Sequence, residues 1–273
     1  MVTVLRPLST SELLDRTFHL YRNNFLVFVG ITAIPQLAVL ALQLGTAAMI
    51  LQRQLIGVGL MAVVAGLGSY IAIEISHAAT IMAVSNLHLD RPASIGTAYS
   101  AAKSSLLRVI GITLAVAIAT GIAFIFLIVP GVYLALAWSL TIPVTVLEGG
   151  GLNASTSRSK ALTKGSRGRI FVIYFLMLVL TLIVAFVMQF VLLLPLGIIM
   201  GAIGVHDRAA AGAMSQTLQA VGGFISTSLV GPLITIALTL IYYDQRVRKE
   251  GFDLQLMMAT LQPNQQSAVA GSI

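Results

Sequence analysis

The chain has 273 residues, of which 58% are hydrophobic and only 9% are charged. Soluble domains carry about 25% charged residues, so this composition excludes an ordinary water-soluble globule and predicts an integral membrane protein. The net charge of +7 comes from basic residues that stand in short blocks beside apolar runs. This arrangement favours membrane topology and anionic lipid head groups, and we expect no nucleic-acid partner.

The first unit of the chain begins with a capping signal. Ser9 and Glu12 have the spacing of a capping box, which predicts a helix that runs to about residue 23. Its apolar side chains recur at helical spacing, so it should lie in the membrane interface. Two spans follow, over residues 25–44 and about 55–84, and Pro35 lies inside the first.

The second unit has the same order. Ser94 is expected to cap an amphipathic helix over residues 95–108, and a span over 109–129 follows. The pair Pro130-Gly131 predicts a turn before a short fourth span over 132–147.

The third unit is the most basic. Asn153 is expected to cap a helix rich in lysine and arginine, which leads into a fifth span over 170–194 that Pro195 ends. A polar, alanine-rich loop or a short helix is predicted over residues 206–219, and a sixth span over 221–242.

Together these patterns predict an all-α integral membrane protein with six transmembrane helices. They indicate one membrane domain over residues 1–255, and a flexible cytoplasmic tail over 256–273. The units at about 9–84, 94–148 and 153–243 form an internal repeat of interfacial amphipathic helix plus helical hairpin.

The repeat also predicts orientation. Because each unit contributes two spans, all three amphipathic helices should lie on one side of the membrane. Of the 16 basic residues, all but Arg53 and Arg208 fall on that side. The positive-inside rule therefore places both termini in the cytoplasm.

Three blocks carry a family resemblance, namely PLSTSELLDRTFHLYRNNF, PGVYLALAWSLTIPVTVLEGGGLNASTSRSKALTKG and YYDQRVRKEGFDLQ. The chain, from about residue 7 to 255, resembles the glycerophosphoryl diester phosphodiesterase membrane-domain family and related uncharacterised bacterial six-span proteins. The most specific pieces are Glu148 followed by Arg158-Ser159, and the charged run from Tyr243 to Gly251. The resemblance implies a six-span domain of a bacterial inner membrane. The resemblance implies no hydrolase activity, because the phosphodiesterase barrel that is fused to some relatives has no counterpart in this chain.

Two residues stand out inside the spans. Glu74 is the one carboxylate placed well within a span, and His77 can share its helix face at i+3. An ionisable group at this depth costs about 2.5–3.5 kcal/mol, so Glu74 should face protein or water. The pair is either a proton or cation site, or a contact for a polar head group, or a structural hydrogen-bonded pair. We favour the structural interpretation and expect no metal, because one Glu-x-x-His is too sparse for a di-metal bundle.

Charged residues gather where spans end on the cytoplasmic side. Glu148 and Asp244 are expected to form structural ion pairs with arginines, with Arg158 and Arg246 the nearest candidates. A pocket for anionic lipid or phosphate could be built from Arg158, Lys160, Arg246 and Arg248. The alternative is a salt-bridged collar that anchors the helices. On the opposite side, the run His206-Asp207-Arg208 is interpreted as a loop feature.

No catalytic motif was recognised, since the chain lacks cysteine, a P-loop, G-x-S-x-G and H-E-x-x-H. We therefore expect no enzymatic activity and no cofactor. The leading hypothesis is a lipid-associated scaffold or accessory subunit that binds anionic lipid or a partner protein through its cytoplasmic basic collar. The alternative is a transporter or lipid-translocating protein that uses Glu74 and His77 inside the bundle.

Overall fold

Long helices make up the protein, and the computed structural model describes residues 8–89, 91–203 and 207–251. The predicted flexible tail lies outside these ranges. The helices are α1 (Thr10–Asn23), α2 (Phe25–Leu51), α3 (Leu55–His88), α4 (Ile95–Ala102), α5 (Leu106–Phe126), α6 (Ile128–Ala137), α7 (Thr141–Glu148), α8 (Leu152–Thr163), α9 (Arg167–Ile203) and α10 (Arg208–Glu250). In the described part of the chain, six helical segments are long and apolar enough to cross a membrane, with α6 and α7 together forming the fourth. The prediction of an all-helical protein with six candidate membrane spans is therefore confirmed for the described residues.

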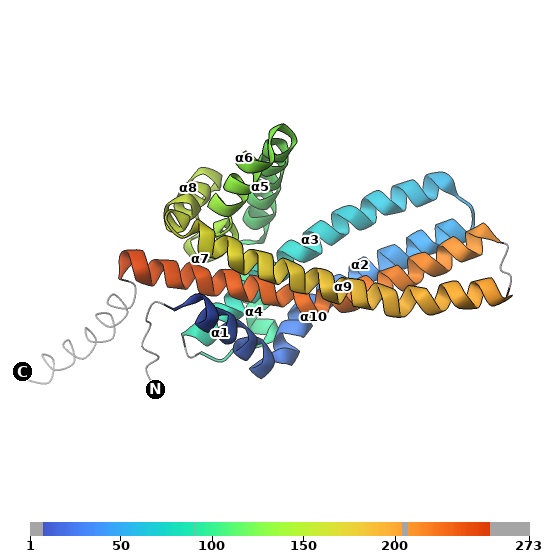
Figure 1. Ribbon diagram of the computed structural model, residues 1–273, viewed down its shortest axis with the longest axis horizontal. Coiled ribbons are helices and arrows are strands. Elements are labelled where there is room, and N and C mark those ends of the chain that lie inside the picture. Colours follow the sequence, from blue (N-terminus) through green and yellow to red (C-terminus); the bar gives the residue numbers. More distant parts are fainter. Residues whose placement is uncertain (1–7, 90, 204–206, 252–273) are drawn as a thin grey trace, which may run out of the picture.

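Helix α10 is the element on which the others pack. It contacts α2, α9, α3 and α1 along its length, and its second half is almost fully buried, from Val230 to Gln245. Figure 1 shows α2, α3, α9 and α10 running lengthwise, with α1, α4, α7 and α8 gathered at the end where the described chain starts and finishes. The core lies at that end, where Leu13, Phe28, Leu140 and Leu162 pack with Ile241. Burial of such side chains contributes about 1.5–3 kcal/mol each.

The α5–α6 hairpin leans away from the four lengthwise helices (Figure 1). Its tip is apolar and open, since Ile125, Phe126 and Ile128 are each more than 70% exposed. An apolar surface of this kind suits a position against lipid. The hairpin is held at its base, where the Tyr70 hydroxyl of α3 donates to the Ile110 carbonyl at 2.6 Å.

Two of the predicted helix starts are confirmed. The Glu12 amide donates to Ser9 Oγ at 3.2 Å, and the Ser9 amide donates to Glu12 Oε2 at 2.7 Å, which completes the capping box of α1. Ser94 makes the equivalent pair with Thr97 at the start of α4. The predicted cap at Asn153 is wrong, because α8 begins one residue earlier and its N-cap is Gly151.

Two helix boundaries that were predicted from prolines are wrong. Pro130 lies in the first turn of α6, where its missing N–H is not needed, so Pro130-Gly131 is not the turn. The chain instead turns at Leu127, which is extended. Pro195 lies inside α9, which continues to Ile203, since proline is tolerated in membrane helices.

Other predicted helix boundaries also differ from those in the structure. The predicted helix over 95–108 is divided at residues 103–105, and the fourth span is interrupted at 138–140. Of the loop and the short helix considered for 206–219, the structure has a helix, which begins at Arg208 and is continuous with the sixth span, while His206 lies outside the described ranges. The charged run after residue 242 continues α10 to Glu250, and Gly251 ends it with a positive φ of 59°.

Candidate functional site

Arg158 links three helices at the end that carries the short helices. Its Nε donates to Glu148 Oε2 of α7 at 2.9 Å, and its Nη2 donates to Glu250 Oε2 of α10 at 2.9 Å. Hydrogen bonds to Glu250 and then Glu148 raise the pKa of Arg158 above its ordinary value. The guanidinium is thus permanently charged and shared between two carboxylates, which is the bidentate geometry that arginine favours.

The same network extends along α10. The Tyr242 hydroxyl donates to Glu148 Oε1 at 2.8 Å. Arg246 donates to Glu250 Oε2 at 3.2 Å and lies over the Tyr242 ring, with its guanidinium carbon 5.7 Å from the ring centroid. We call Arg158, Glu148, Glu250, Tyr242 and Arg246 the first clamp.

A second clamp surrounds Asp244, whose side chain is 1% exposed. Asp244 accepts hydrogen bonds from Arg169 of α9 at 2.6 Å, from Arg248 at 2.9 Å, and from the Leu8 amide at 2.8 Å. Arg248 also donates to the Leu8 carbonyl. The carboxylate therefore joins the segment before α1, the start of α9 and the end of α10.

The structure corrects one predicted partner. Asp244 pairs with Arg169 and Arg248, and Arg246 pairs with Glu250 instead. Residues four apart share a helix face, whereas Arg246 lies only two positions after Asp244 and points elsewhere. The sequence-based reasoning did not consider Glu250 or Arg169 as partners, although the i,i+4 spacing of Arg246 and Glu250 was a usable signal.

The four residues predicted to hold an anion do not meet in one pocket. Arg158 and Arg246 both engage Glu250 in the first clamp, while Arg248 belongs to the second. Lys160 is exposed on α8. Three of the four predicted ligands are therefore already bound to carboxylates within the chain.

Exposed cations lie beside the clamps, at the junction of α8 and α9. Lys160 and Lys164 are exposed, and Arg167 lies over the Tyr133 ring at 4.3 Å from its centroid. Lys249 donates to the backbone carbonyls of Ala161 and Lys164, at 2.8 and 2.6 Å. We call Lys160, Lys164 and Arg167 the basic rim.

Glu74 and His77 lie inside the bundle, as predicted from their spans. His77 Nδ1 is 3.7 Å from Glu74 Oε2, and the two side chains are 25% and 8% exposed. Neither of these two atoms has a hydrogen-bond partner in the described part of the chain. The pair is close enough for charge attraction but does not form a hydrogen bond.

Two cavities lie between α2, α3 and α10, at the level of this pair. One has a volume of about 40 Å³, and its lining includes Thr32, Gln36, His77 and Thr235. The other has a volume of about 120 Å³, and its lining includes Gln36, Gln43, Ser69 and Thr227. Sequence-based reasoning singled out His77 but missed Gln36, because this glutamine stands alone within an apolar run.

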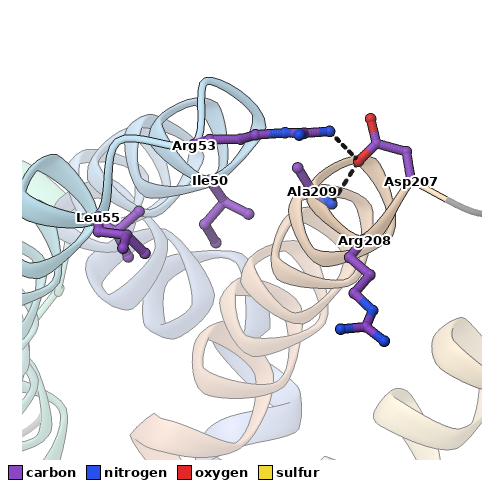
Figure 2. Close-up of a pocket in the computed structure, with 7 residues that line it drawn as sticks. Ile50, Arg53, Leu55, Asp207, Arg208 and Ala209 are labelled. Atoms are coloured by element: carbon purple, nitrogen blue, oxygen red, sulfur yellow. Dashed lines mark hydrogen bonds and ion pairs between the residues drawn. The ribbon is translucent and has the colours of Figure 1, made fainter.

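The opposite end of the bundle carries an open depression of about 770 Å³, lined by Ile50, Arg53, Leu55, Asp207 and Arg208, among others. Figure 2 shows Arg53 reaching Asp207, at 3.0 Å, while Arg208 points away from that pair. Asp207 also caps α10 by accepting from the Ala209 amide at 2.9 Å. This backbone hydrogen bond is the main cause that lowers the pKa of Asp207, and the nearby Arg53 charge lowers it further.

The residues of this depression therefore have a structural role. The Arg53 and Asp207 side chains are 72% and 49% exposed, so their pair contributes little to stability. Its effect is to tie the α2–α3 connection to the start of α10. Among the residues that the structure describes, no group of three or more histidine or acidic side chains could hold a metal ion.

No family model, curated protein or solved structure matches this chain, so the family resemblance rests on its sequence motifs alone.

Proposed function

We propose that the chain is a non-enzymatic, multi-pass protein of the bacterial inner membrane that associates with anionic lipid through its cytoplasmic basic end. The proposal includes membership of the resembled membrane-domain family and three repeated units. In support, the short helices α1, α4 and α8 each precede long apolar helices. Both termini are proposed to be cytoplasmic, because the basic residues gather at the end of the bundle where the described chain starts and finishes.

The observation that carries the proposal is the charge excess around the clamps. Residues 148–169 and 242–250 contain eight lysines and arginines against three carboxylates. All three carboxylates, Glu148, Asp244 and Glu250, already accept from arginines. The excess of five positive charges therefore has no neutralising partner within these segments, and anionic head groups are the natural counter-charges beside a membrane.

We assign two roles to the basic residues at this end. Arg158, Arg246 and Arg248 are held in ion pairs, so we propose that they fix the helices. We propose that the basic rim makes the head-group contacts, with Lys160 and Lys164 supplying exposed ammonium groups. Each such cation near an anionic surface contributes about 1 kcal/mol.

Thermal unfolding in a neutral detergent tests this assignment. Anionic phospholipid should raise the melting temperature, because a ligand that binds only the folded state stabilises it, while zwitterionic phospholipid at equal concentration should not. The variant Lys160→Gln with Lys164→Gln should lose most of the increase. Arg53→Gln with Arg208→Gln, at the opposite end, is the matched control and should keep it. An equal increase with both lipids, or a full increase in the lysine variant, would contradict the proposal.

The two cavities favour a second candidate function, transport through the interior around Glu74 and His77. Ionisable side chains at this depth are costly in a protein that only needs to be anchored. Reconstitution into liposomes that contain a pH-sensitive dye tests this candidate for protons. A transporter should acidify the interior under an inward gradient, and Glu74→Gln should abolish the flux; absence of flux in the unaltered protein would remove proton transport.

A further inference from the structure

The two cavities between α2, α3 and α10 adjoin each other, and we call them together the chamber. Gln36, Ile73 and Thr227 line both of them. Gln36 and Thr227 lie near the middle of α2 and α10, respectively. The shared lining therefore sets the two cavities side by side, midway along these helices.

Gln36 indicates what fills the chamber. Its side chain is buried, with 6% of the residue exposed, and it lines both cavities. An amide without a partner in an apolar setting costs at least about 1–3 kcal/mol. A polar cavity can hold a water molecule once it exceeds about 10–15 Å³. Water in the chamber would satisfy Gln36, and the threonine hydroxyls of α2 and α10 offer it further partners.

His77 has one edge toward this chamber and another toward a carboxylate. Its side chain lines the smaller cavity, while its Nδ1 lies 3.7 Å from Glu74 Oε2. An imidazolium needs a counter-charge and a hydrogen-bond acceptor for each N–H at this depth. Glu74 supplies the first, and water beside Gln36 supplies the second.

We propose that the two cavities form one hydrated chamber and that His77 binds a proton there, with Glu74 as its counter-ion. The inference uses the site of the second candidate function, but proton binding does not require transport. A protein that shows no proton flux could still bind a proton at His77. The flux assay therefore tests transport, and the NMR titration tests proton binding.

Among the described residues that line the two cavities, His77 is the one titratable side chain. Helix α2 has no titratable side chain, and those of α10 lie at its two ends, at Arg208 and from Tyr242 onward. The other helices that pack against α3 carry one titratable side chain each, namely Tyr99 on α4, Arg108 on α5 and Glu148 on α7. On α3 itself, Tyr70 donates to the Ile110 carbonyl and is near enough to Glu74 for an electrostatic interaction, while His88 stacks on Tyr243 at the end of the helix.

Nitrogen NMR of the full chain in lipid nanodiscs tests the proposal, with ¹⁵N-labelled histidine and a pH titration. The chain has four histidines, and His77→Gln assigns the signal of interest by its loss. We expect that signal to change from imidazole to imidazolium as the pH falls. Glu74→Gln should weaken proton binding at least tenfold, seen as a midpoint lower by one unit or more.

Gln36→Leu tests the chamber separately, because the leucine is similar in size to glutamine but removes the amide. We expect the His77 midpoint to fall by about one unit, and transfer of magnetisation from water to His77 to decrease. Gln189→Leu is the matched control, since Gln189 also lies in a span but lines neither cavity, and it should change neither reading. Thr227→Val replaces Gln36→Leu if the latter does not fold.

Two results would overturn the proposal. One is a His77 signal that stays neutral over the whole range in the unaltered protein. The other is a midpoint that is unchanged in both Glu74→Gln and the chamber variant.

Discussion

Arg169 donates a hydrogen bond of 2.6 Å to Asp244, across 75 residues of sequence. The pair joins the first turn of α9 to the last two turns of α10, at the end where the core is densest. Because the Asp244 side chain is 1% exposed, loss of this carboxylate would leave Arg169 and Arg248 without their shared counter-charge.

Asp244→Asn should therefore destabilise the fold strongly. The variant keeps the volume of the side chain but leaves Arg169 and Arg248 without their counter-charge, at a cost of about 3 kcal/mol. Differential scanning calorimetry in detergent should show a melting temperature lower by roughly 6–12 °C. Asp15→Asn, on the exposed face of α1, is the control and should leave it unchanged. Equal melting temperatures for both variants would show that the second clamp does not stabilise the fold.

The Arg158–Glu250 pair should give a measurable coupling energy. Arg158 is 31% exposed, so solvent screening reduces its contribution, and we expect about 1 kcal/mol. A double-mutant cycle with Arg158→Ala and Glu250→Ala, followed by urea unfolding, measures it. The coupling should decrease in high salt. A coupling of zero at low salt would mean that the bidentate contact is not formed in solution.

Gly131→Ala should disturb the α5–α6 hairpin. A Cβ atom at this position would overlap Cγ of Phe124, so the ring must move. Overpacking of this kind costs about 1–3 kcal/mol. Gly121 lies in the same hairpin with open space around it, so Gly121→Ala should have no steric cost. Circular dichroism melting of the two variants compares them, and an equal loss in both would point to glycine flexibility instead of packing.

Tyr99 should make stability fall at alkaline pH. Burial raises the pKa of Tyr99 from 10.0 to about 12, and its hydroxyl donates to the Ile31 carbonyl of α2. A raised pKa means that the folded state keeps the proton, so the contribution is complete below pH 10 and is lost as the pH rises toward 12. The difference in unfolding free energy between the unaltered protein and Tyr99→Phe should decrease over that range. A constant difference would contradict the burial of this hydroxyl.

Membrane orientation can be tested directly, because the chain has no cysteine. Single substitutions Ser157→Cys and Gln52→Cys place a thiol at exposed positions on the two opposite ends. In intact cells, a membrane-impermeant maleimide should label only Gln52→Cys. Labelling of Ser157→Cys without cell disruption would place the basic end outside.

Much of the fold could be predicted from the sequence. Apolar runs of membrane length fix the number of spans, and the Ser9 and Ser94 capping signals fix two helix starts. Proline was the main source of error, since Pro130 and Pro195 lie within helices. A lipid-facing helix loses little at proline, so this residue marks boundaries less reliably there than in soluble proteins.

The site was predictable in part. Glu148 and Arg158 are close in sequence at the end of a span, so their contact could be predicted, and the structure contains it. The Asp244–Arg169 contact joins residues that are distant in sequence, and helix periodicity carries no information about such pairs. Gln36 was also missed, because its importance depends on a cavity that exists only when α2, α3 and α10 pack together.

Native mass spectrometry of the protein released from membranes measures the central claim most directly. It counts the lipids retained by each molecule and identifies their head groups. We predict that the unaltered protein retains anionic phospholipid, and that Lys160→Gln with Lys164→Gln loses it while Arg53→Gln with Arg208→Gln does not. Retention of zwitterionic lipid alone, or unchanged anionic lipid in the lysine variant, would contradict the account.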